Sequence, residues 1–345
     1  MNSIIEKRKQ RWIDLYENNQ KSGALIFIGQ NYGNAPLPYP ENKNKRIEYS
    51  LNTYKIQMDA LEYMDDDKIP WVSPYTGTEL FAGAFGCKIK YPGDNMPFAL
   101  PFVFNPADAA KVKYPDLKNS PPIIEIFDIA DKLRNSEPDA LMHLPDIQSP
   151  LDIAALIWNK EDLFASMYED PEAVKELVLM VEKFLTEFLD LWFERYGIEF
   201  VAHHPDYYMP YGITFSEDEV GAISPAMFGE FSLGSLNRLS ERYGAAGMHC
   251  CADSRHQWDN FKKIKNLRLI NLNLTHTPDK FQYAYKYFEN TCVQMHSGPN
   301  IDDELYFNRQ NKNMRVVIQD WANTKEEAIE KSKRLREKYC NIPLA

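Results

Sequence analysis

Short apolar runs alternate with longer amphipathic segments along most of this chain. Apolar runs of about four to eight residues that end in polar loops are typical of buried strands, whereas apolar residues three or four apart indicate helices. The strand pattern occurs at 24–29, 69–73, 140–144, 198–203, 245–251, 267–274, 292–297 and 314–320. The helical pattern occurs at 3–20, 46–64, 121–135, 150–168, 171–195, 224–242, 256–263, 278–288, 301–308 and 324–338. This order predicts parallel strands with right-handed crossovers.

Eight strand–helix units in 345 residues predict an α/β fold, a (β/α)8 TIM barrel. The helix at 3–20 would be an N-terminal extension, and the turn-rich segment 84–104 would be a hairpin-like insertion. We expect the whole chain, 1–345, to form a single barrel domain. An open doubly wound sheet is the alternative, but no G-x-G-x-x-G motif follows any predicted strand.

Polar side chains gather where the predicted strands end, and in a barrel these ends share one mouth. None of the seven histidines precedes residue 143. Residues at or just beyond these strand ends are candidates for contacts with a substrate: Gln30, Asn31, His143, Gln148, His204, His276 and Asn300. His204 and His276 would hydrogen-bond a substrate or orient another ligand.

The segment Met248-His249-Cys250-Cys251 carries the strongest chemical signal in the chain. Residues two apart on a strand point to the same side, so His249 and Cys251 can converge while Cys250 faces away. An imidazole and a thiolate are two of the three protein ligands that an open zinc site requires. Inert thiols at a buried strand end are the alternative interpretation.

The third zinc ligand is not fixed by the sequence. His296, at the end of the seventh predicted strand, is our candidate, and Asp320 at the end of the eighth is another. Cys292 lies at the start of its strand, which is the wrong end of a barrel for this role.

The aromatic, Pro-rich segment 205–215 is predicted to be a loop that forms a lid or a wall of the pocket, with Tyr207 and Tyr208 in contact with substrate. Simple packing on the barrel rim is the alternative. Asp218, in the acidic segment 216–219, is a candidate acid or base. The alternative is that this segment is simply a turn exposed to solvent. Arg255 offers a contact for an anion, or else it caps a helix.

Composition limits the function. A net charge of −11 argues against a nucleic-acid partner, which requires a basic face. Five cysteines at irregular spacing do not form a disulfide framework and favour a reducing cytoplasm. No apolar run reaches the roughly 18 residues that cross a bilayer. We therefore expect a soluble cytoplasmic enzyme.

Three segments resemble motifs of the uroporphyrinogen decarboxylase-like superfamily. The segment 223–231 is similar to its "SP..F.EF" motif, and 298–302 is similar to its "GN-x-DP" turn. The segment 247–251 is similar to its "H-x-C-G" strand end, with Ala252 in place of the glycine. The superfamily contains uroporphyrinogen decarboxylases and zinc-dependent methyltransferases that move methyl groups to or from corrinoid proteins and thiols.

Departures from the family pattern favour the methyltransferase branch. The decarboxylases carry an arginine-rich loop after the first strand, but residues 29–35 here contain no cation. The resemblance implies zinc on the H-x-C pair and methyl transfer between a small thiol or methyl ether and a corrinoid on a partner protein. Asp218, His204 and Gln148 are expected to contact the substrate. Decarboxylation of uroporphyrinogen or a smaller acid without metal, and a non-catalytic ligand-binding barrel, are the alternatives.

Overall fold

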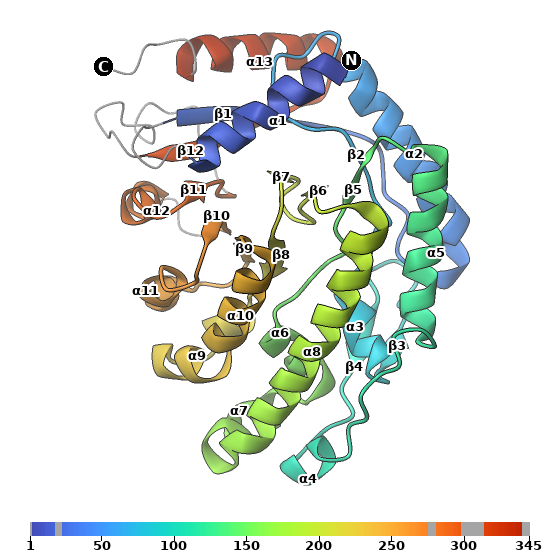
Figure 1. Cartoon of the computed structure of the whole chain (residues 1–345), viewed down its shortest axis with the longest axis vertical. Coiled ribbons are helices and arrows are strands. Elements are labelled where there is room, and N and C mark those ends of the chain that lie inside the picture. Colours follow the sequence, from blue (N-terminus) through green and yellow to red (C-terminus); the bar gives the residue numbers. More distant parts are fainter. Residues whose placement is uncertain (1, 18–22, 275–280, 298–313, 340–345) are drawn as a thin grey trace.

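The computed structural model describes residues 2–17, 23–274, 281–297 and 314–339 (Figure 1). Its strands are β1 Gly23–Gln30, β2 Trp71–Val72, β3 Lys88–Lys90, β4 Phe98–Leu100, β5 Leu141–His143, β6 Phe200–Val201, β7 Tyr208–Met209, β8 Ile213–Ser216, β9 Ala246–Cys250, β10 Leu267–Leu272, β11 Val293–Gln294 and β12 Arg315–Ala322. Its α-helices are α1 Asn2–Glu17, α2 Lys43–Ala60, α3 Glu79–Ala84, α4 Pro106–Ala109, α5 Pro121–Ser136, α6 Pro150–Ile157, α7 Lys160–Glu169, α8 Pro171–Tyr196, α9 Pro225–Phe231, α10 Leu233–Tyr243, α11 Trp258–Phe261, α12 Phe281–Phe288 and α13 Lys325–Tyr339. Three short 3-10 helices lie at Pro40–Asn42, Glu219–Gly221 and Arg255–Gln257.

The strands at the centre of the molecule form two sheets. One sheet has the order β1-β12-β11-β10-β9-β8, in which every pairing is parallel. The other has the order β2-β5-β6-β7, in which only the β6–β7 pair is antiparallel. Helices follow most of these strands in sequence, as the alternating pattern predicts, and the α/β fold class is confirmed.

Backbone hydrogen bonds join the two sheets at both edges. Beyond β5, Ile147 O accepts from Ser216 N at 2.9 Å and Ser149 N donates to Ser216 O at 2.8 Å, which ties β8 to the second sheet. Ahead of β2, Asp67 N donates to Ile26 O of β1 at 2.7 Å. These bonds link the edges of the two sheets, whose strands are otherwise paired in separate ladders.

The sequence prediction is wrong for the segment 205–215, which holds two short strands where a loop was expected. β7 pairs with β6, and β8 pairs with β9 over Ile213–Ser216. The predicted fourth strand, 198–203, is consequently only the two-residue β6. β8 alternates as Ile-Thr-Phe-Ser, but over only four residues, and it directly follows a segment with Pro210 and Gly212 that is typical of a loop.

Two predicted helices are each divided in two. Trp158 is extended and ends α6, after which the side chain of Asn159 caps α7 by accepting from Asp162 N. Ser232 separates α9 from α10 without a side-chain cap, because its hydroxyl donates to Glu217 instead. The predicted starts at Pro150, Pro171 and Pro225 are confirmed, and in each case the preceding Ser or Asp side chain accepts a backbone N–H of the first turn.

The remaining elements cover the barrel. α1 and α13 lie against β1 at the end of the molecule where Figure 1 shows the N-terminus. The predicted insertion is an antiparallel hairpin of β3 and β4. No helix among the described residues is long and apolar enough to cross a membrane. The predicted helix at 301–308 lies outside the described residues, as do His276 and Asn300.

Close packing inside the barrel requires glycine at position 247. A Cβ atom there would lie 2.0 Å from the Tyr207 hydroxyl oxygen and 2.9 Å from the carbon that bears it. We expect Gly247→Ala to lower the free energy of unfolding by about 1–3 kcal/mol, because an overpacked core must shift its neighbours. Chemical denaturation monitored by circular dichroism measures the change.

Gly229 on α9 provides the control, since an added Cβ there meets no heavy atom within 4 Å. Gly229→Ala should stabilise the protein by about 0.5–1 kcal/mol through helix propensity. Equal effects of the two substitutions would contradict the packing described for Gly247.

Candidate functional site

A cavity of about 510 Å³ lies at the carboxyl ends of the parallel strands. It takes residues from β1, β2, β5, β6, β8 and β9 or from the segments that follow them, as a barrel site should. The predicted site residues that line it are Gln30, His143, Gln148, His204, Asp218, His249 and Cys251.

Asp218, His249 and Cys251 form a compact donor group in the wall of this cavity. One ligand atom from each lies within 4.8 Å of the others. His249 Nε2 is 2.8 Å from Cys251 Sγ, so the two side chains converge as the strand geometry predicts. Cys250 faces away, and its thiol contacts the Ser254 hydroxyl at 3.2 Å. An imidazole, a thiol and a carboxylate at this spacing could hold a metal ion.

Asn271 on β10 determines which nitrogen of His249 is available. The Asn271 amide nitrogen donates to Met295 O, so its Oδ1 must face His249 Nδ1, which lies 2.6 Å away. An amide oxygen can only accept, and Nδ1 therefore carries the proton. The lone pair of His249 is left on Nε2, the atom next to the Cys251 sulfur. Sequence reasoning missed Asn271, because nothing in an apolar strand marks one amide as the partner of a histidine.

Buried carboxylates hold Asp218 in place. Asp152, at the start of α6, accepts the backbone N–H groups of Asp218 at 2.7 Å and of Glu219 at 3.0 Å. Glu217 is fully buried and accepts from the Ser232 hydroxyl at 2.8 Å. Burial raises the pKa of both Asp152 and Glu217, and their proximity adds to the effect. Asp218 itself accepts the backbone N–H of Cys251.

Three histidines extend the polar wall beyond the donor group. The His204 ring centre is 4.4 Å from that of His249. Loss of solvation and the neighbouring His249 ring lower the pKa of His204 to about 4, so it is a neutral imidazole at pH 7. His143 Nε2 is 3.2 Å from the Asp206 carboxylate, and His203 Nε2 is 3.0 Å from the Ser216 hydroxyl. The neutral His204 ring can donate a hydrogen bond to a substrate or accept one from it.

Several buried polar atoms facing this region have no hydrogen-bond partner among the described residues: Gln30 Oε1, Gln148 Oε1 and His203 Nδ1. Unpaired buried polar groups are rare in folded proteins and are common where a ligand or a water completes the bonding. The prediction that Gln30 and Gln148 contact a substrate is thus consistent with their positions.

The structure does not place His296 or Asp320 in the donor group. The His296 ring is buried, with Nδ1 accepting from Leu272 N and Nε2 3.0 Å from Gln294 Oε1. Both of its nitrogens are therefore used inside the β10–β11 region. Asp320 ion-pairs with Lys331 at 3.3 Å and with Arg334 at 3.5 Å, against α13. The third donor is Asp218, which the sequence indicated as an acid or base.

Four other predicted substrate contacts lie away from the cavity. Tyr207 is fully buried above Gly247 in the barrel interior, and Tyr208 is buried where its carbonyl accepts from the Tyr16 hydroxyl, so neither forms part of a lid. The guanidinium of Arg255 lies over the Tyr283 ring at 4.6 Å. Asn31 is exposed, and its side chain accepts from Gly33 N at 2.9 Å in a local turn.

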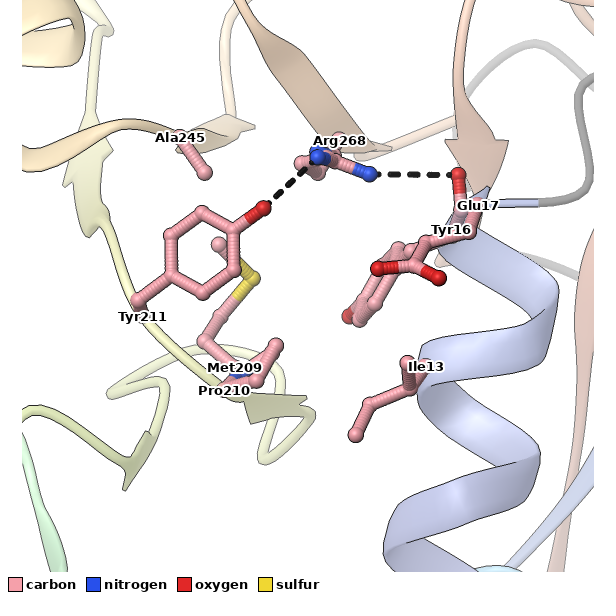
Figure 2. Close-up of a pocket in the computed structure, with 8 residues that line it drawn as sticks. All are labelled: Ile13, Tyr16, Glu17, Met209, Pro210, Tyr211, Ala245 and Arg268. Atoms are coloured by element: carbon pink, nitrogen blue, oxygen red, sulfur yellow. Dashed lines mark hydrogen bonds between the residues drawn. The ribbon is translucent and has the colours of Figure 1, made fainter.

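A second cavity lies at the other end of the barrel, between α1 and the amino ends of β8, β9 and β10 (Figure 2). In it, Arg268 donates to the Tyr211 hydroxyl at 2.8 Å and to the Tyr16 carbonyl at 3.3 Å. Its volume of about 10 Å³ is room for one water molecule at most. This second cavity is therefore too small for a substrate, and the cavity that contains the donor group is the candidate site.

Asp146 allows a test of the electrostatics of the larger cavity. Burial, together with the nearby Asp218 charge, raises the pKa of Asp146 to about 7. An acid whose pKa is raised on folding stabilises the protein at low pH, and this stability is lost as the pH rises through the folded-state pKa. In chelator-treated protein, we expect Asp146→Asn to flatten the fall in unfolding free energy between pH 5 and pH 8 by on the order of 2 kcal/mol.

Urea denaturation at the two pH values measures this difference. Asp94→Asn, in an exposed turn, controls for the loss of one negative charge. An unchanged pH slope in Asp146→Asn would contradict the raised pKa of this carboxyl group.

Comparisons with known proteins agree with this architecture. The family model described as uroporphyrinogen decarboxylase (URO-D) matches residues 54–299, well over half of the chain. No curated protein sequence matches. Among solved structures, a methyltransferase from Methanosarcina mazei is similar, with a TM-score of 0.65 and 10% identity, over 96% of this chain and 98% of that chain. At this identity the likeness establishes a shared fold.

The family match confirms the resemblance found in the sequence motifs and the predicted TIM-barrel fold class. The segments that carry that resemblance at 223–231 and 247–251 both lie within the matched range. The chain belongs to the uroporphyrinogen decarboxylase (URO-D) family.

Proposed function

We propose that this protein is a zinc-dependent methyltransferase that moves a methyl group between a small thiol or methyl ether and a corrinoid carried by a partner protein. The observation that carries the proposal is the Asp218–His249–Cys251 donor group in the wall of the cavity. The similar fold of a methyltransferase supports it.

The donor group fits zinc better than the harder cations. Imidazole nitrogen and thiolate sulfur are ligands that Zn²⁺ prefers, whereas Mg²⁺ and Ca²⁺ are bound by oxygen. Three protein donors leave one coordination position for a substrate atom, as catalytic zinc sites do. Asn271 supports the same assignment, because the hydrogen bond from Nδ1 that orients a zinc-binding histidine is already present.

Different residues of the chain would have different roles in the reaction. Bound Zn²⁺ would act as a Lewis acid on the sulfur or oxygen that carries the methyl group. Asp152 fixes the backbone that bears Asp218, and Asn271 fixes the tautomer of His249. His204 and Gln148, which line the cavity, would hydrogen-bond the substrate.

The transfer is a displacement at the methyl carbon. The bond between that carbon and the donor heteroatom breaks, and the electron pair stays on the heteroatom, which then takes up a proton. The electron pair of the new bond would come from the partner's corrinoid, which must therefore be supplied in a reduced, nucleophilic state. A cavity that positions the methyl group supplies orientation, which can account for much of the rate of such a step.

Decarboxylation of uroporphyrinogen is the second candidate because the family carries that name. The charged residues that line the cavity argue against this reaction, because few of them are cations that could bind carboxylates. Lys68 is the one Lys or Arg among the described residues that line the cavity, whereas Asp146, Asp206 and Asp218 all face it. A substrate with eight carboxylates would lose its hydration without gaining cations in exchange.

Metal content distinguishes the two adjacent cysteines. We expect wild-type protein purified in zinc-containing buffer to hold about one Zn²⁺ per chain by elemental analysis. Cys251→Ala should lose at least about nine-tenths of it, because removing one of three ligands weakens zinc binding severely. Cys250→Ala is the matched control and should retain it, since that thiol faces away from the donor group. Equal zinc in wild type, His249→Ala and Cys251→Ala would refute the metal site.

Activity separates the three candidate functions. In the reverse direction, a methylated corrinoid protein and a thiol should give the thioether, a proton and the reduced corrinoid protein with the wild-type enzyme. His249→Ala should lower this rate by at least about 100-fold because the Lewis acid is lost. Mass spectrometry follows the product. The same protein should release no carboxyl groups from uroporphyrinogen under reducing conditions. Prompt decarboxylation there would replace our proposal, and binding without turnover in either assay would favour a non-catalytic barrel.

A further inference from the structure

Exposed apolar side chains cluster on the hairpin that follows β2. Of the fifteen large hydrophobic side chains that are exposed among the described residues, six lie between residues 91 and 104. Four of these alternate along β4 and its continuation and form an apolar ridge: Phe98, Leu100, Phe102 and Phe104, which are 43%, 36%, 40% and 51% exposed. Single exposed hydrophobic residues are ordinary, but a contiguous group of them marks an interaction surface.

The backbone of the ridge is firmly held. Ile157 O, at the end of α6, accepts from Phe102 N at 3.1 Å and from Val103 N at 3.2 Å, and Asn159 N donates to Val103 O at 2.9 Å. Val103 and Ala99 are buried on the inner side of the same segment. Proteins normally cover or charge the outer side of such an edge strand, because an exposed apolar one aggregates. The ridge is therefore a fixed surface that a partner would cover.

The hairpin lies at the rim of the candidate site. A Cβ atom on Gly77 would be 3.1 Å from Met96 Cε, and both chain neighbours of Gly77 line the cavity. The Tyr39 hydroxyl, in the segment after β1, accepts from Gly93 N at 2.8 Å and donates to Asn95 O at 2.7 Å, which fixes the turn. Figure 1 shows the hairpin next to α3 and α6, away from α1 and α13. A molecule resting on the ridge would thus stand beside the mouth of the barrel.

Positive charge accompanies the ridge. In the register of the hairpin, Lys88 lies opposite Leu100 and Lys90 lies opposite Phe98, and the Lys90 ammonium is 5.9 Å from the centre of the Phe98 ring. Both lysines are exposed, and neither forms an ion pair with a carboxylate of the described residues. This face is basic although the whole chain carries a net charge of −11. Apolar side chains with charged groups at their edge are the usual anatomy of a protein interface.

The charges favour an acidic partner over a second copy of this chain. A two-fold contact would bring two further lysines to the same face, and like charges placed together oppose association. A corrinoid bound to a carrier protein can reach a donor group inside the cavity only if the carrier rests on the rim. The ridge is a rim surface of this kind, and its charge matches a carrier with carboxylates.

We propose that the apolar ridge, together with Lys88 and Lys90, is the docking surface for the corrinoid protein, which presents an apolar patch edged by carboxylates. This inference rests on the proposed function and adds to it the surface that the partner uses. None of the ridge side chains lines the cavity or belongs to the donor group, so docking can be separated from chemistry.

Two methyl donors, a methylated corrinoid protein and free methylcobalamin, test the ridge with a thiol as the acceptor. Phe98→Ala combined with Phe102→Ala should raise the KM for the corrinoid protein by about 10-fold or more, because aromatic side chains at the centre of an interface carry much of its affinity. The rate with free methylcobalamin should stay within about 2-fold of wild type, since a free corrinoid needs no docking.

Ile198→Ala is the control, because this side chain is 61% exposed and precedes β6 at the opposite end of the barrel. It should change the rate with neither donor. Equal losses with both donors in the double variant would indicate damage to the fold, and that result, or an unchanged KM for the corrinoid protein, would overturn the docking surface.

Charge reversal provides a second test, which needs no turnover. Lys88→Glu combined with Lys90→Glu should slow association with the corrinoid protein by about 10-fold at low salt, and the difference should largely vanish at about 0.5 M NaCl. Surface plasmon resonance measures both rates. Lys55→Glu, at an exposed position of α2, controls for the change in net charge and should have little effect. Unchanged or faster association of the double variant would contradict an acidic partner.

These measurements separate the docking surface from the proposed function. Wild-type protein that binds the corrinoid protein through the ridge but transfers no methyl group from either donor would sink the proposed function alone. Methyl transfer that the ridge variants leave unaltered would sink the docking surface alone. Light scattering addresses the other occupant: a wild-type dimer that the Phe98 and Phe102 substitutions convert to a monomer would assign the ridge to a second copy and overturn the proposal.

Discussion

The parallel pairing of β8 with β9 is the constraint on which the site depends. Its register sets Ser216 beside His249, and the next residue continues the ladder, with Glu217 N donating to His249 O at 2.9 Å. Asp218 then reaches the backbone N–H of Cys251. Side chains from the two strands meet because the pairing register fixes which residues of β8 and β9 lie side by side. A shift of one residue would turn every side chain of β8 to the opposite face.

Burial of acidic groups behind the site follows from the same pairing. Asp152 and Glu217 are both almost fully buried, and neither forms an ion pair with a Lys, Arg or His of the described residues. Because their pKa values are raised, the two carboxyl groups can stay protonated, which avoids the unfavourable free energy of a buried charge. In exchange, Asp152 provides two acceptor atoms for the backbone of 218 and 219, and Glu217 accepts from Ser232. The segment that carries the third donor is thereby held without a salt bridge.

The cavity lining carries more acidic side chains than lysines and arginines. Gln30, Tyr32 and Trp71 occupy the region after the first strand and at the second, and Lys68 is the single described cation in the lining. A metal ion bound by Asp218 and Cys251 would cancel their two negative charges, and Lys68 would balance Asp206. The resulting pocket is close to neutral and partly aromatic. Such surroundings suit a small ligand with one charge at most, and the family fold accommodates this change because loops at strand ends vary while the barrel persists.

The sequence by itself determined the α/β class, most strands and helices, and the convergence of His249 with Cys251, because these follow from local periodicity of two or about 3.6 residues. Only the tertiary structure decided the third donor, the role of Asn271 and the position of Lys68. Each of these depends on a contact between residues at least 22 positions apart, such as Asn271 with His249 or Asp218 with Cys251. The failure of His296 as a ligand has the same origin. Its neighbours on β10 and β11 use both ring nitrogens, and no pattern along one strand reports what an adjacent strand presents.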